Sequence, residues 1–78
     1  MNTEHLVHMA NQIGAFFESF PDRQEAKKGI ADHIHKFWEP RMRLGLLNML
    51  NKPDTHNLAE LVREALLEHQ TSLQAIRH

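Results

Sequence analysis

FPDRQEAKKGIADHIHKFWEPRMR, residues 20–43, holds two of the three prolines and the clearest helical pattern of the chain. Asp22 follows the first of these prolines and Glu25 stands three residues later, the spacing of a capping box that starts a helix. Pro40 disfavours helical geometry for the residue before it, so this helix is expected to end near residue 38 or 39. One face of the helix is expected to carry its apolar residues: Ala26, Ile30, Ile34 and Phe37.

Apolar residues at helical spacing predict a helix on each side of this segment. The preceding helix is expected to start after Asn2 or Thr3 and to stop before Pro21, with the stripe Leu6, Ala10, Ile13, Phe17 and Phe20. The following helix is expected to begin at Pro40, since a proline is tolerated in a first turn, and to close around Asn51. Its stripe is Met42, Leu46, Met49 and Leu50.

A fourth helix is predicted after a loop at residues 51–56. Asn57 and Glu60 form a second candidate capping pair for its start. His69 falls within its apolar stripe, where a core histidine is expected rather than a metal ligand. The inward positions of this helix are Leu58, Leu61, Val62, Ala65 and Leu66, continued by Leu73 and Ile76.

These four helices predict an all-α fold, a single small bundle over residues 1–78 with short connections. Projection of each helix at about 100° per residue leaves five apolar residues at or beyond the shoulders of their stripes. They are Phe16, Trp38, Leu44, Leu47 and Leu67. Such residues either widen the core or form an exposed apolar patch, which on a small domain marks a protein partner.

Composition excludes several classes of function. Nine Lys and Arg against ten Asp and Glu give a net charge of −1, which provides no field for nucleic acid or an anionic membrane. No apolar run approaches the roughly 18 residues of a membrane span, and the N-terminus lacks the pattern of a signal peptide. The expected compartment is therefore the cytoplasm. The absence of cysteine removes disulfides, thiolate catalysis and Cys-based metal sites.

The residues also argue against catalysis or metal binding by this chain. The seven histidines include no pair at i, i+4 spacing, and fragments such as His5 with His8 supply two ligands each. The three glycines are isolated inside expected helices, so there is no glycine-rich phosphate loop. Each glycine either permits close helix approach or is merely tolerated.

Two long segments resemble a known protein family. MANQIGAFFESFPDR, residues 9–23, and GIADHIHKFWEPRMR, residues 29–43, resemble the delta subunit of soluble NAD-dependent formate dehydrogenases. LVREAL, residues 61–66, resembles the closing segment of that family. The resemblance covers about residues 1–67 and leaves out residues 68–78, a polar helix end or tail.

The resemblance implies a non-catalytic accessory subunit of a cytoplasmic complex that oxidises formate and passes the electrons to NAD. Such a chain would bind the large catalytic subunit and support assembly or stability of the holoenzyme. The molybdenum- or tungsten-pterin, the iron–sulfur clusters and the FMN would belong to other subunits. The lack of cysteine agrees, since iron–sulfur clusters are held by thiolates.

Four of the matching residues are expected to contact the catalytic subunit: Phe16, Trp38, Arg41 and Arg43. Other matching positions are explained by the fold, as a helix stop, a cap or core residues: Pro21, Asp22, Phe17 and Phe37. In this hypothesis the two aromatic side chains are anchors and the two arginines are orienting charges.

Two functions of other classes stay open. The basic and aromatic residues around Pro40 would suit a small nucleic-acid-binding or regulatory module. The net charge of −1 argues against nucleic-acid binding. The surplus leucines would alternatively close a homodimer of the isolated chain.

Overall fold

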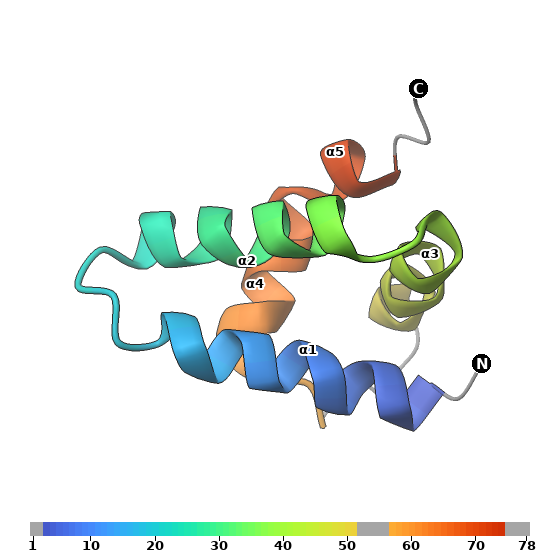
Figure 1. Cartoon of the computed structure of the whole chain (residues 1–78), viewed down its shortest axis with the longest axis horizontal. Coiled ribbons are helices and arrows are strands. Elements are labelled where there is room, and N and C mark those ends of the chain that lie inside the picture. Colours follow the sequence, from blue (N-terminus) through green and yellow to red (C-terminus); the bar gives the residue numbers. More distant parts are fainter. Residues whose placement is uncertain (1–2, 52–56, 75–78) are drawn as a thin grey trace.

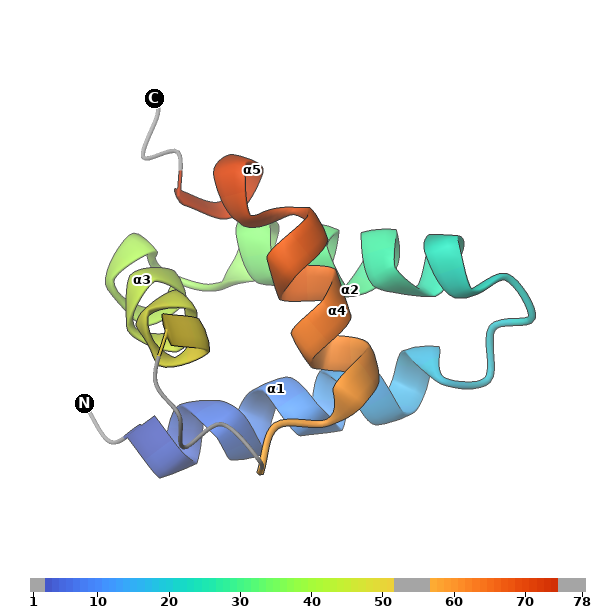
Figure 2. The same ribbon diagram turned by 180° about the vertical axis from the view of Figure 1, so that it is seen from behind.

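The computed structural model describes residues 3–51 and 57–74. Within them the fold is all-helical, as predicted: α1 (Thr3–Phe17), α2 (Arg23–Phe37), α3 (Pro40–Asn48), the 3-10 turn η1 (Met49–Asn51), α4 (Glu60–Glu68) and α5 (Gln70–Gln74). α1 and α2 lie side by side and antiparallel, and α4 crosses one side of the pair (Figures 1 and 2). α3 starts on the opposite side of this pair and runs across the layer that the pair forms (Figures 1 and 2). The molecule as a whole is flat, with extents of 32 × 31 × 18 Å.

The turn between α1 and α2 confirms one prediction and corrects another. The side chain of Asp22 caps α2, since its Oδ1 accepts hydrogen bonds from the backbone N–H groups of Gln24 at 2.9 Å and Glu25 at 3.4 Å. α1, however, ends at Phe17 and does not run through Phe20. Because Phe20 precedes a proline, helical geometry is disfavoured there, and its N–H closes the turn on the carbonyl of Phe17 instead.

The start of α4 corrects the predicted Asn57 and Glu60 capping pair. The N-cap residue is Ala59, and no side chain of α4 itself makes a cap hydrogen bond. The amide of Asn11 on α1 provides it instead. Its Oδ1 accepts from the Ala59 N–H at 2.8 Å, and its Nδ2 donates to the carbonyl of Asn57 at 2.9 Å.

α4 is the centre of the core. Val62, Ala65 and Leu66 are fully buried between the other helices. Gly14 of α1 permits this packing, because a Cβ at that position would collide with Cγ2 of Val62.

The predicted fourth helix is interrupted. It breaks at His69, whose backbone leaves α-geometry (φ −109°, ψ 21°), and continues as α5. His69 is half-buried at this break rather than a core residue. Leu73 is buried as expected, whereas Ile76 and residues 52–56 of the loop predicted at 51–56 lie outside the described residues. Asn51, the first residue of that predicted loop, belongs to η1.

The end of α2 reverses the expected roles of two aromatic residues. Phe37, placed in the core by its helical spacing, is 72% exposed, and Trp38 is only 6% exposed. Trp38 is the C-cap residue, with extended backbone (φ −92°, ψ 141°). Its side chain therefore leaves the direction that a helical projection assigns and turns into the core. Of the other surplus residues, Leu47 is buried and Leu44 half-buried against the core, whereas Leu67 and Phe16 are exposed.

Candidate interaction surface

The structure separates the four predicted partner-binding residues into two exposed and two buried ones. Phe16 is 69% exposed near the end of α1, and Arg41 is exposed in the first turn of α3. Trp38 and Arg43 lie in the interior, with Arg43 only 7% exposed. Phe16 and Arg41 can thus meet a partner directly, whereas Trp38 and Arg43 offer it almost no surface.

Arg43 ties together three segments of the fold. Its Nη1 donates to the carbonyls of His35 at 3.0 Å and Trp38 at 3.1 Å, both at the end of α2. Its Nε donates to the carbonyl of Leu73 in α5 at 3.3 Å. A guanidinium carries five N–H donors in a rigid fork, so one side chain serves carbonyls from separate segments. Arg43 therefore stabilises the turn between α2 and α3, next to which Arg41 lies.

Phe16 belongs to an aromatic cluster at the α1–α2 turn. Its ring centroid lies 5.0 Å from that of Phe17, edge to face, and 6.3 Å from that of Phe20. Phe17 in turn packs on α2, since its ring lies where a Cβ of Gly29 would be. At the other end of α2 the exposed ring of Phe37 lies 4.8 Å from that of His33. Phe37 is an exposed aromatic residue that the sequence pattern assigned to the core.

An ion cluster between α2 and α4 was also missed by the helical projection. The Lys27 side chain is only 7% exposed, and its Nζ lies 2.5 Å from Oε2 of Glu68 and 3.6 Å from Oε1 of Glu64. Arg23 Nε donates to the same Glu64 oxygen at 3.0 Å. The hydrogen bond from Arg23 lowers the pKa of Glu64 below its usual 4.5, and the hydrogen bond from Lys27 lowers that of Glu68.

This cluster predicts acid sensitivity. Both carboxyl groups have lower pKa values in the folded than in the unfolded state, so the folded chain binds fewer protons at acidic pH. Their stabilisation is present above the ordinary pKa of 4.5 and is lost as the pH falls through the folded-state values. We expect the free energy of unfolding, measured by urea titration, to decrease between about pH 6 and pH 3, and the double variant Glu64→Gln with Glu68→Gln to flatten this decrease.

The matched control for this prediction is Glu25→Gln, because the side chain of Glu25 makes no ion pair within the described residues. It should leave the acid slope as in the wild type. A double Glu64 and Glu68 variant with the wild-type slope would show that the cluster contributes nothing to the acid response.

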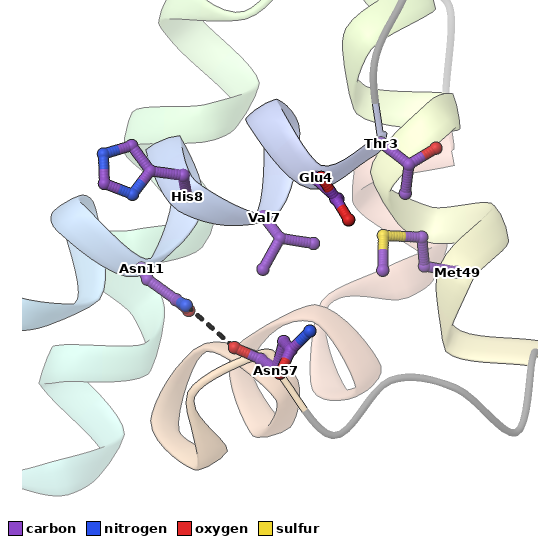
Figure 3. Close-up of a pocket in the computed structure, with 7 residues that line it drawn as sticks. All are labelled: Thr3, Glu4, Val7, His8, Asn11, Met49 and Asn57. Atoms are coloured by element: carbon purple, nitrogen blue, oxygen red, sulfur yellow. Dashed lines mark hydrogen bonds between the residues drawn. The ribbon is translucent and has the colours of Figure 1, made fainter.

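A pocket opens beside the first turns of α1 (Figure 3). It has a volume of about 460 Å³ and is lined by Thr3, Glu4, Val7, His8, Asn11, Met49 and Asn57. The Asn11 amide is already engaged with the start of α4, as Figure 3 shows. The other polar side chains of the lining are those of Thr3, Glu4, His8 and Asn57.

A smaller pocket of about 240 Å³ lies at the α1–α2 turn. Its lining includes Phe17 and Phe20, together with Leu61 of α4.

Metal ions and iron–sulfur clusters are held in proteins by cysteine, histidine and carboxylate side chains. The sequence has no cysteine. In the part of the chain that the structure describes, no three His, Asp or Glu side chains come together as a metal-binding group. Among the same residues no helix is both long and apolar enough to cross a bilayer.

Comparison with known proteins finds one family. No curated protein and no solved structure matches the chain significantly. The family model of the NADH-dependent formate dehydrogenase delta subunit matches residues 5–66, which is most of the chain and includes most of α1, all of α2 and α3 and the greater part of α4. The unmatched C-terminal part contains α5. The chain therefore belongs to the family of formate dehydrogenase delta subunits.

Proposed function

We propose that this chain is a non-catalytic accessory subunit that binds the large catalytic subunit of a cytoplasmic NAD-dependent formate dehydrogenase and supports assembly or stability of the holoenzyme. Family membership over residues 5–66 carries the proposal. The pterin-bound molybdenum or tungsten, the iron–sulfur clusters and the FMN would be held by other subunits, in keeping with a chain that has no cysteine.

Phe16 and Arg41 are the direct contacts in this proposal, because both side chains are exposed. Trp38 and Arg43 act on the partner indirectly, because they stabilise the turn between α2 and α3. Arg43 fixes the carbonyls of His35 and Trp38 just before the turn into α3, and Arg41 lies one residue beyond Pro40.

The proposal is tested by affinity purification of the tagged chain from its native host, with a formate-dependent NAD reduction assay on the eluate. Recovery of the large subunit in an active complex supports a resident subunit. Recovery of inactive catalytic chain without cofactors supports a role in assembly. Recovery of neither contradicts the proposal. A strain without this chain, compared for activity and for the amount of intact complex, shows whether the holoenzyme depends on it.

A further inference from the structure

α5 lies outside the segment that matches the family, yet it packs on helices inside that segment. The helix breaks at His69, and the chain then leaves the direction of α4 and brings α5 against α3 and the end of α2 (Figure 2). Leu73 is the buried residue of α5, with 1% of its surface exposed. Residues beyond the matched segment therefore contribute to the core at α2 and α3.

Arg43 of α3 also stabilises the end of α5. The carbonyl of Leu73 lies in the last turn of α5, where a backbone carbonyl has no partner within its own helix. The Nε of Arg43 donates to this carbonyl at 3.3 Å and so caps α5 from α3. A helix of five residues has little stability alone, so α5 depends on this hydrogen bond and on the burial of Leu73.

The dependence is mutual, because the same guanidinium also holds the end of α2. Its Nη1 donates to the carbonyls of His35 and Trp38 at 3.0 and 3.1 Å. The guanidinium is planar and rigid, so the hydrogen bond to Leu73 through Nε helps to fix the plane in which Nη1 reaches α2. α5 thus orients Arg43, and Arg43 joins α2 to α3.

The turn between α2 and α3 needs such support from outside. Trp38 and Glu39 both have extended backbone, and the N-cap residue Glu39 makes no side-chain cap hydrogen bond to α3. The direction in which α3 starts is therefore set by contacts with other segments, among which are the hydrogen bonds of Arg43. Arg41 lies in this first turn of α3 and is exposed, so its position relative to the rest of the molecule depends on the turn.

We propose that α5 is a clamp that holds the α2–α3 turn, and with it Arg41, in the orientation that the large subunit of formate dehydrogenase binds. α5 positions Arg43, Arg43 holds the turn, and Arg41 makes the contact. This inference rests on the proposed function and assigns a role to residues 70–74, which lie beyond the matched segment.

The clamp is tested first on the full chain by the fluorescence of Trp38, because the sequence has one tryptophan and no tyrosine. Ser72→Pro should undock α5, since a proline disfavours helical geometry at Thr71 before it, whereas Ser72 itself is exposed. We expect the emission of Trp38 to shift to longer wavelength and its quenching by acrylamide to increase, with little change in far-UV circular dichroism. Ser72→Ala is the matched control and should keep the wild-type emission, because it alters the same side chain and retains the helix.

A second pair of variants changes the buried residue of α5. Leu73→Ala should reproduce the spectral change, whereas Leu73→Met, which nearly conserves volume, should keep the wild-type emission. Rapid hydrogen exchange at the amide of residue 73, which donates to the carbonyl of His69, identifies the variants in which α5 is undocked. Wild-type emission of Trp38 in a variant with undocked α5 overturns the clamp.

The effect on binding is tested with the complex purified from a strain that lacks this chain. The complex is titrated with the wild-type chain, Arg41→Ala, Ser72→Pro and the double variant. We expect Ser72→Pro to weaken binding about fivefold or more. Arg41→Ala should weaken binding less in the Ser72→Pro background than in the wild type, because a displaced turn no longer presents Arg41 to the partner.

The outcomes separate this inference from the proposed function. Arg41→Ala with the same effect in both backgrounds, or tighter binding by Ser72→Pro, overturns the inference and leaves the proposed function standing. Wild-type chain that does not bind the complex overturns both.

Discussion

Arg43→Ala should destabilise the isolated domain by about 3 kcal/mol or more, a large part of the roughly 4 to 12 kcal/mol expected for a domain of this length. The guanidinium donates to three carbonyls, those of His35, Trp38 and Leu73. Without it, carbonyls in a buried region lose their donor, and each unsatisfied group costs about 1–3 kcal/mol. Urea unfolding followed by circular dichroism measures the change.

Arg41→Ala is the control for this prediction, since Arg41 has the same side chain two residues earlier but is exposed. It should change stability by less than about 0.5 kcal/mol. Arg43→Lys should recover only part of the loss, because an ammonium has the charge but not the planar fork that reaches separate carbonyls. Equal stability of the Arg43 and Arg41 alanine variants would contradict the structural role of Arg43.

The second large effect is expected at Gly14. A Cβ here would collide with Cγ2 of Val62, a stiff β-branched side chain in a fully buried position. Gly14→Ala should therefore cost about 2 kcal/mol, although alanine is the better helix former. At Gly45 a Cβ would meet only the end of the Leu6 side chain at 3.1 Å, so Gly45→Ala should be neutral or stabilise by up to about 1 kcal/mol.

A double-mutant cycle separates this collision from other effects. Val62→Ala removes Cγ2, so Gly14→Ala in that background should no longer destabilise. Additive costs in the double variant would show that the contact between α1 and α4 does not limit residue 14. Denaturant unfolding of the four proteins gives the coupling energy.

The sequence predicted those features that depend on neighbours in the chain. Asp22 and the prolines fix the ends of α2 locally, and most of the apolar stripes of the four expected helices do line the core. It misplaced residues whose surroundings come from elsewhere. Trp38 and Phe37 exchanged roles because the chain becomes extended at the C-cap, where helical projection no longer applies. The second capping pair failed because Asn11 already engages the start of α4.

The burial of Arg43 and Lys27 could not be predicted from local sequence patterns for the same reason. Arg43 is buried because carbonyls of α2 and α5 meet beside it, and Lys27 because two carboxylates of α4 face it. Nothing in the spacing of either residue on its own helix indicates this. Of the four predicted partner-binding residues, Phe16 and Arg41 are exposed, and their contact with a partner stays a prediction. The exposure of the Phe37 ring emerged only with the three-dimensional arrangement.

The Asn11 amide also bears on how the chain folds. It joins α1 to Asn57 and Ala59, which lie 46 and 48 positions further along the chain. The first turn of α4 is therefore completed only once a long loop has closed. A helix of nine residues has little stability alone, and its nucleation is costly. The C-terminal half should therefore not act as an independent folding unit: α4 gains its starting point from α1, and the domain should form in one cooperative transition rather than in two stages.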